Sequence, residues 1–425
     1  MKRKLAAAIT IAGMMVSVAA CGGNSKDDSK DAGPGSWKGQ TLTVWTMDGS
    51  APPQWTKDVQ AAFEKQTGAK VNFQIQKWDG IQQKITTALS EDTPPDVLEV
   101  GNTQTPAYAA TGGLADLADV KKAIGADWTP SVSQSSVYDG KQYAAPWYFA
   151  NRVVIYNKAI WAKAGITATP KTRDEFFKDL ETIGKKTDAE PLYLPGQNWY
   201  FFDGLIIGQG GELVKKQGDT YVSNLADPKV AAAMETYKKY ASYSKAPKDK
   251  DEATPQQAQV FAKGKTGAFI GMGWEAATAI QANKAIEKDL GYFTIPGVGA
   301  DKPEGVFLGG SNLAVAQNSK HQSLAKEFLK VALSDQYEGE LAKLSGIVPN
   351  KASLESNVQG NPAAEAAAPA AAGGGTTPLI PEWAAVENTP NPIKSYMTSV
   401  LNGKDPAAAA KDVESEINKR LAQKN

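Results

Sequence analysis

The sequence has few of the residues that most catalytic and metal sites use: its 425 residues include one cysteine, Cys21, and one histidine, His321. A single cysteine cannot form an intramolecular disulfide. A single histidine excludes a histidine-rich zinc site and the HExxH motif. A Ser-His-Asp triad would have to use His321, which stands in the polar run NSKHQS and is expected at the solvated surface instead.

The charge balance and the glycine pattern exclude further classes of function. Lysine and arginine together number 46, as do aspartate and glutamate, so the chain has no excess of positive charge to attract nucleic acid. The run Gly264-Lys265-Thr266 looks like the end of a phosphate-binding loop, but the first glycine of that motif would fall at Gln259. The sequence has no GxGxxG or GxSxG at a strand–helix junction and no calcium loop of EF-hand type. We therefore expect neither a cofactor nor a bound metal.

Residues 1–20 have the order of a secretory signal peptide, with a positive start at Lys2 to Lys4, an apolar run from Leu5 to Val18, and small residues after it. The run of about 14–16 apolar residues is short for a bilayer-spanning helix, which needs about 20, and a short membrane anchor is the alternative. The segment Val18-Ala19-Ala20-Cys21 resembles the bacterial lipobox, which implies cleavage before Cys21 and lipid attachment to it. Residues 21–36 are polar and rich in glycine and serine, which is typical of a flexible tether. We expect a globular body that lipid holds at the extracellular face of the cytoplasmic membrane.

Beyond this tether, strand-like and helix-like segments alternate. Three short segments rich in β-formers predict strands: Thr41–Met47, Val71–Gln76 and Asp96–Val100. Apolar residues at helical spacing predict a helix after each of the first two strands: Trp55, Val59 and Phe63, then Ile81, Ile85 and Leu89. The order β-α-β-α-β indicates a parallel sheet.

Two polar loops follow the first and third of these strands. They are Asp48–Ser50 and Asn102–Gln104. In open α/β sheets, ligands bind beyond the carboxyl ends of the strands. The two loops are therefore expected at one rim of a ligand site, although the same residue types also make ordinary turns.

A second block of strands and helices begins near Trp147, with Asn151–Asn157 as its first strand. The alanine-, glycine- and proline-rich segment Gln359–Thr377 is expected to be an exposed loop. Asp405 followed by Pro406 predicts the start of a final helix, since aspartate caps helices and proline suits the first position.

Aromatic residues cluster beside polar ones. The chain has 10 tryptophans and 14 tyrosines, and several stand next to amides, carboxylates or an arginine: Trp147-Tyr148-Phe149, Trp199-Tyr200-Phe201-Phe202, Trp274 and Trp383. The apolar face of a sugar ring packs on an aromatic ring, and the sugar hydroxyls need fixed donors and acceptors. Core packing is the alternative for each aromatic residue taken singly. The grouping favours a carbohydrate site.

Six segments in one order resemble the extracellular solute-binding proteins of bacterial ABC sugar importers, the maltose-binding-protein-like group. They are TLTVWTM, PPDVLEVGNTQTPAYAATGGLADL, YAAPWYFANRVVIYNKAIWAKAGI, FAKGKTGAFIGMGW, LGGSNLAVAQNSKHQSLAKEFLKVAL and GIVPNKASL. The resemblance runs from about Lys38 to the C-terminus. It implies an α/β fold of the type II periplasmic-binding-protein kind, with two lobes that each hold a mostly parallel sheet flanked by helices. It places residues 37–146 and 305–344 in one lobe, and residues 147–304 and 345–425 in the other.

The resemblance also implies a function. The protein would be a monomeric, non-catalytic receptor that captures an oligosaccharide between its lobes and delivers it to an ABC permease in the membrane. Matched by position, the expected ligand-binding residues are Asp48, Gly49, Ser50, Asn102, Thr103, Gln104, Trp147, Tyr148, Arg152, Asn198, Trp199, Tyr200, Trp274, Glu275, Gly310, Ser311, Asn312 and Trp383.

One departure from the family pattern bears on the expected sugar. Asn102-Thr103-Gln104 stands where maltose binders carry an Asp-Arg pair, which argues against maltose. The exported lipoprotein form and the amide-rich loops look similar to binders of N-acetylglucosamine oligosaccharides such as chitobiose. An exported glycosidase that uses two rim carboxylates is the alternative. Its candidate acids are Asp48, Asp203, Glu275 and Glu382. A peptide-binding or adhesion module is a third possibility.

Overall fold

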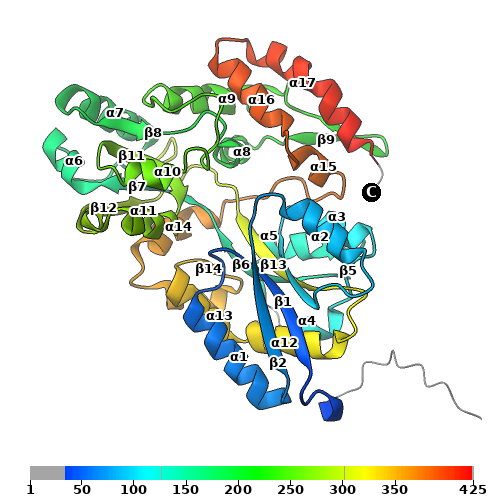
Figure 1. Ribbon diagram of the computed structural model, residues 1–425. Coiled ribbons are helices and arrows are strands. Elements are labelled where there is room, and N and C mark those ends of the chain that lie inside the picture. Colours follow the sequence, from blue (N-terminus) through cyan, green and yellow to red (C-terminus); the bar gives the residue numbers. More distant parts are fainter. Residues whose placement is uncertain (1–33, 126, 301, 424–425) are drawn as a thin grey trace, which may run out of the picture.

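The computed structural model describes residues 34–125, 127–300 and 302–423, which form two α/β lobes (Figure 1). The predicted signal peptide, Cys21 and most of the expected tether lie outside the described residues. The end of the tether forms a short 3-10 helix, η1 (Pro34–Ser36). Among the helices that are described, none is both long and apolar enough to cross a membrane.

The first lobe is built on a six-stranded sheet in the order β14-β6-β13-β3-β1-β2. Strand β1 pairs in parallel with β2 and with β3, as the β-α-β-α-β order predicts. The six strands are β1 (Thr41–Met47), β2 (Lys70–Gln76), β3 (Val97–Gly101), β6 (Ala145–Ala150), β13 (Gly309–Val315) and β14 (Val348–Pro349).

Helices cover both faces of this sheet, and the two predicted apolar stripes are buried in its cores. The helices of this lobe are α1 (Pro53–Thr67), α2 (Ile81–Leu89), α3 (Thr105–Ala110), α4 (Ala118–Ala123), α5 (Pro130–Ser133), η2 (Gln134–Ser136), α12 (Gln322–Ala332), α13 (Asp335–Ser345) and η4 (Ala352–Val358). A small hairpin, β4 (Val137–Tyr138) and β5 (Lys141–Gln142), completes the lobe.

The second lobe has a four-stranded sheet in the order β12-β7-β11-β8. Its strands are β7 (Arg152–Asn157), β8 (Glu190–Tyr193), β11 (Thr266–Met272) and β12 (Leu290–Phe293), and its hairpin is β9 (Val214–Gln217) with β10 (Thr220–Ser223). Its helices are α6 (Lys158–Ala164), α7 (Arg173–Lys186), α8 (Trp199–Gly208), α9 (Pro228–Ala241), α10 (Gln257–Phe261), α11 (Glu275–Ala282), η3 (Lys284–Asp289), α14 (Pro362–Ala371), α15 (Trp383–Glu387), α16 (Pro392–Leu401) and α17 (Pro406–Leu421). As predicted, Asp405 caps α17, since its side chain accepts a hydrogen bond from the Ala408 amide.

The chain crosses between the lobes after β6, between β12 and β13, and after η4. These crossings differ in place from two expected boundaries. Strand β6 stays in the first sheet as far as Ala150, and β14 pairs with β6, so residues 147–150 and 348–349 lie with the first lobe. The helix η4 packs on α13 and β14, which takes the chain to Val358 in the same lobe.

The crossovers also change how the strands pair. Parallel pairing occurs at β1–β2, β1–β3 and β8–β11, whereas β6, β13, β14, β7 and β12 pair antiparallel. The expectation of mostly parallel sheets is therefore wrong in detail. A strand that enters a sheet from the other lobe runs against its neighbours there, because no helix returns it to the starting edge.

The prediction that Gln359–Thr377 is an exposed loop is also wrong, since most of this segment forms α14. Alanine has the highest helix propensity, so a run of alanines needs only a start signal. Asn361 supplies this signal by accepting hydrogen bonds from two backbone amides, and Pro362 follows it. Ala364 and Ala367 are buried, so the helix packs against the body of the protein.

Candidate functional site

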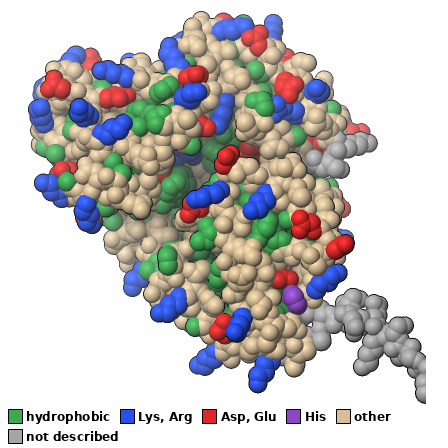
Figure 2. Space-filling view, viewed as in Figure 1, with side chains coloured by type: hydrophobic (Ala, Val, Ile, Leu, Met, Phe, Trp, Pro, Cys, Tyr) green, Lys and Arg blue, Asp and Glu red, His purple; other side chains and the backbone are tan. Residues whose placement is uncertain are grey.

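The main cavity of the protein lies between the two lobes and has a volume of about 530 Å³. Figure 2 shows the surface hollowed between the upper and lower parts of the molecule, with apolar side chains at the hollow. The residues that line the cavity come from the rim loops of the first lobe, from the second lobe, and from the crossover strands. This is a size and a position typical of small-ligand sites.

Most of the predicted site residues lie together around this cavity. The lining includes Asp48, Gly49, Ser50, Asn102, Thr103, Gln104, Tyr148, Arg152, Tyr200, Trp274, Gly310 and Ser311. The two rim loops meet because β1 and β3 are neighbouring parallel strands whose carboxyl ends share one edge. That these residues contact a ligand stays a prediction.

The remaining predicted residues do not line the cavity. They are Trp147, Asn198, Trp199, Glu275, Asn312 and Trp383, and all are buried. Trp147 packs on Trp55 in the core of the first lobe, at 5.2 Å between ring centroids. Asn198 caps α8, and Asn312 donates hydrogen bonds to Thr105 and Ser135. The large aromatic rings are buried, and both amides form hydrogen bonds within the protein, so these side chains have a structural role here.

Two tryptophans differ from the others in exposure. Trp274 is 50% exposed and Trp78 is 45% exposed, whereas the other eight tryptophans are exposed by 9% or less. Trp274 follows β11 in the second lobe, Trp78 follows β2 in the first, and both line the cavity. Each lobe therefore offers one exposed indole to the cavity. The sequence reasoning missed Trp78, although it follows the carboxyl end of a predicted strand as the two rim loops do.

A buried carboxylate stands behind the first-lobe wall of the cavity. Glu99 lies on β3, is fully buried, and accepts hydrogen bonds at Oε1 from the hydroxyls of Ser50 (2.7 Å), Tyr148 (3.0 Å) and Ser311 (2.6 Å). Its Oε2 accepts a hydrogen bond from the Met47 amide at 2.6 Å. Burial raises the pKa of Glu99, and these hydrogen bonds oppose the rise. Glu99 thus holds together three lining residues, which come from the loop after β1, from β6 and from β13.

The backbone also approaches closely at this wall. A Cβ atom on Gly310 would lie 2.2 Å from the carbonyl oxygen of Tyr148, so any larger residue would push β13 away from β6. Asn102 spans the same junction, because its amide donates to the Leu308 carbonyl and accepts from the Gly310 amide. The Asn102 side chain therefore uses both its amide nitrogen and its amide oxygen within the protein, where they hold β13 against the loop after β3.

The second-lobe side of the cavity carries a layered arrangement. Arg152 Nη2 pairs with Glu252 Oε1 at 2.6 Å, and its guanidinium lies 5.4 Å from the centroid of the Tyr200 ring. The Tyr200 ring in turn stacks on Phe307, at 4.5 Å between centroids and 17° between planes. Glu252 and Phe307 also line the cavity, and neither was predicted. The charge of Arg152 is thus balanced at the cavity, which leaves this side close to neutral.

Two further acids lie below Tyr200. The Tyr200 hydroxyl donates a hydrogen bond to Glu387 on α15, and burial raises the pKa of Glu387. Burial raises the pKa of Asp203, one turn further along α8, to about 8, with the nearby Glu387 carboxylate adding to the rise. Asp203 is buried and lies outside the cavity lining, so the structure does not bring it to a sugar-facing position as a glycosidase would require.

Glu275, predicted to meet the ligand, points inward instead. Its carboxylate accepts hydrogen bonds from Gln257 Nε2 at 2.9 Å and from the Met272 amide at 2.7 Å. Burial raises the pKa of Glu275 to about 7. A Cβ atom on Gly271 would lie 2.4 Å from Glu275 Oε2, so glycine is needed for this close approach. Glu275 therefore holds the turn that presents Met272 and Trp274 to the cavity.

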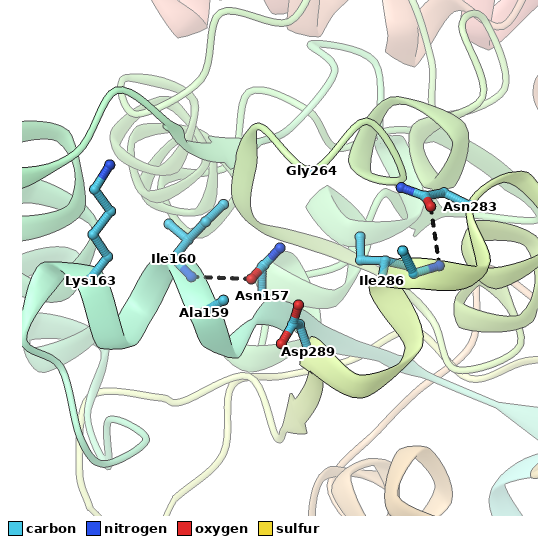
Figure 3. A pocket seen from close by; sticks show the side chains of 9 residues that line it. Asn157, Ala159, Ile160, Lys163, Gly264, Asn283, Ile286 and Asp289 are labelled. Atoms are coloured by element: carbon cyan, nitrogen blue, oxygen red, sulfur yellow. Dashed lines mark hydrogen bonds between the residues drawn. The ribbon is translucent and has the colours of Figure 1, made fainter.

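A smaller hollow of about 340 Å³ lies on the second lobe, between α6 and η3 (Figure 3). Its asparagines are used within the protein: Asn157 accepts from the Ile160 amide, and Asn283 from the Ala285 amide. Lys163 points away from the hollow in this view. No group of three or more His, Cys, Asp or Glu side chains in the described part of the chain could hold a metal ion. The cavity between the lobes is therefore the candidate site.

Comparison with known proteins agrees with this geometry. Residues 48–339 match the family described as bacterial extracellular solute-binding protein. Over 423 residues, which span all of both chains, the protein is 73% identical to the diacetylchitobiose binding protein DasA of Streptomyces coelicolor. It is 25% identical to a galactooligosaccharide-binding protein of Bacillus subtilis, over 96% of this chain and 95% of that one.

Solved structures give the same fold. The GacH receptor of Streptomyces glaucescens, solved unliganded and with acarbose, aligns with a TM-score of 0.77 at 25% identity, over 91% of this chain and all of that chain. The sugar-binding protein MalE of Xanthomonas citri aligns with the same TM-score at 22% identity, over 90% of this chain and 98% of that one, which speaks for the fold alone. The predicted type II two-lobed fold is thus confirmed. The protein belongs to the bacterial extracellular solute-binding proteins.

Proposed function

We propose that this protein is the sugar receptor of an ABC importer and that it captures diacetylchitobiose between its lobes. The observation that carries the proposal is the cavity itself, a nearly neutral space lined by hydroxyls, amides and two exposed tryptophans from opposite lobes. The full-length identity of 73% to a diacetylchitobiose binding protein supports the choice of sugar. The relatives compared are binding proteins, so they give no support to the exported glycosidase.

The cavity residues divide by the part of the sugar that they suit. Trp78 and Trp274 would pack on the apolar faces of the sugar rings. Ser50, Tyr148 and Ser311 offer hydroxyl oxygens on one wall, and Gln104 adds an amide. We leave the buried Trp147, Trp199 and Trp383 out of this proposed contact set.

We further propose where the receptor works. The extracellular family and the lipobox support a monomer that is anchored through lipid on Cys21 at the outer face of the cytoplasmic membrane, where closure of the lobes would present the sugar to permease subunits. Cys21→Ala should then release the protein from the membrane fraction into the medium. Retention of the variant in the membrane fraction would contradict the lipid anchor.

Titration calorimetry of the two-lobed part of the protein, residues 37–425, with diacetylchitobiose, maltose and N-acetylglucosamine tests the proposed ligand. We expect tight binding of diacetylchitobiose and weak or no binding of maltose. Thermal unfolding gives an independent measure, since a ligand at 100 times its Kd adds about 2.7 kcal/mol to the free energy of unfolding. Absence of heat and of stabilisation with diacetylchitobiose would refute the choice of sugar, and release of free N-acetylglucosamine during incubation would refute a receptor without catalysis.

A further inference from the structure

The hydroxyls around Glu99 have fewer protons than hydrogen bonds to make. Ser50, Tyr148 and Ser311 each carry one hydroxyl proton, and each lies within 3.0 Å of Glu99 Oε1. The hydroxyls also contact one another, with Tyr148 2.8 Å from Ser50 and 3.2 Å from Ser311. The network therefore has three hydroxyl protons for five contacts, so every hydroxyl proton is used within the network.

An ionised carboxylate can only accept hydrogen bonds, whereas a hydroxyl can donate one and accept two. Glu99 is fully buried, and its only hydrogen-bond partners among the described residues are the three hydroxyls and the Met47 amide. Every hydroxyl proton is thus drawn inward, toward the carboxylate or toward a neighbouring hydroxyl. What faces the cavity is the lone pairs of the three oxygens.

We propose that Glu99 is a positioning residue that sets ligand specificity by turning the wall of Ser50, Tyr148 and Ser311 into hydrogen-bond acceptors. This inference rests on the proposed sugar-receptor function and deepens it. The ligand must then meet this wall with donors, which are hydroxyl groups and the N–H of an acetamido group. A group that can only accept, such as an ether oxygen, a fluorine or an amide carbonyl, is rejected there. Its lone pairs would face the lone pairs of the wall oxygens, and no hydrogen bond could form between them.

The orientation of the protons can be observed without any ligand. Neutron diffraction from crystals of the deuterium-exchanged protein, grown at mildly alkaline pH, should place the deuterons of the three hydroxyls toward Glu99 or toward one another. A hydroxyl deuteron that points into the cavity, or a deuteron on Glu99, would overturn the inference. This measurement stands even if diacetylchitobiose proves to be the wrong sugar.

Binding of sugar analogues tests the consequence. We would compare diacetylchitobiose with its single deoxy and single deoxyfluoro analogues, because fluorine replaces a hydroxyl in size but cannot donate. At the position that meets the wall, both analogues should bind the wild-type protein at least tenfold more weakly than the parent sugar. Failure of the parent sugar to bind would refute the proposed function, whereas a deoxyfluoro analogue that binds like the parent at every position would refute the wall inference.

Glu99→Gln supplies the matched variant. The glutamine amide can donate to a hydroxyl, which frees a hydroxyl proton to point into the cavity. The variant should bind the parent sugar more weakly and should now prefer the deoxyfluoro analogue to the deoxy analogue at the wall position. Glu338→Gln is the control, since Glu338 is equally buried in the same lobe but accepts no hydrogen bond from a residue that lines the cavity. An analogue preference that is the same in Glu99→Gln, Glu338→Gln and wild type would contradict the proposal, and thermal unfolding checks that both variants are folded.

Discussion

Trp274→Ala is expected to raise the Kd for diacetylchitobiose by about 10- to 150-fold. The magnitude follows from the exposed half of this side chain. A tryptophan presents up to about 250 Å² of surface, so roughly 125 Å² is open to the cavity. A sugar that covers between half and all of this area, at about 25 cal/mol per Å², contributes about 1.5–3 kcal/mol. Each 1.4 kcal/mol corresponds to about a tenfold change in Kd.

Titration calorimetry is the assay, with two variants for comparison. Trp274→Phe keeps an aromatic face and should lose less affinity than the alanine variant. Val298→Ala removes apolar surface from a strongly exposed residue of the same lobe that does not line the cavity, so it should bind as the wild type does. If Trp274→Ala bound the sugar within twofold of the wild type while remaining folded, the reasoning from exposed indole area would be refuted. The same test applies to Trp78→Ala, where the exposed fraction is similar.

The remaining predictions concern charged and hydrogen-bonded groups at and beneath the second-lobe wall of the cavity. Arg152→Ala leaves Glu252 without its partner and should lower the free energy of unfolding in urea by about 1–3 kcal/mol. The double variant Arg152→Met with Glu252→Gln should lower it by less, and equal losses of stability in the two variants would contradict a paired charge. Burial raises the pKa of Asp203 to about 8, so the folded protein keeps a proton that the unfolded chain releases near pH 4, and the free energy of unfolding should fall as the pH rises between these values. Asp203→Asn should flatten this slope in urea unfolding at several pH values, and an unchanged slope would contradict the prediction. Tyr200→Phe removes the hydrogen bond to Glu387 and should cost about 1–3 kcal/mol of stability, and an unchanged thermal midpoint would show that this bond contributes nothing.

Local patterns in the sequence were enough to predict the scaffold of the first lobe. The stripe of Trp55, Val59 and Phe63 is buried on α1, and the loops after β1 and β3 meet at the cavity. Both results follow from two general rules, namely helical periodicity and the common edge of parallel strands. The antiparallel crossover strands depend on how the chain returns from the second lobe, which no local pattern records.

The individual cavity-lining residues were harder to predict, because burial is a property of the whole fold. Trp147 and Tyr148 are adjacent, yet one lies in the core and the other at the cavity, since successive residues of a strand point to opposite faces. That alternation was a usable signal. So was Glu99, a single acid within the otherwise apolar run Val97–Val100, which a buried strand would hold only with partners.

The unequal exposure of the tryptophans gives the protein a built-in optical reporter. Eight indoles are shielded from water whatever the cavity holds, so their emission forms a constant background. Trp78 and Trp274 are exposed to solvent and lie on opposite lobes, so a sugar bound between them would shield both indoles from water. Emission should shift to shorter wavelength and become less accessible to a soluble quencher as the site fills. Occupancy of the receptor can thus be followed in the native chain, without a dye and without a coupled transport assay.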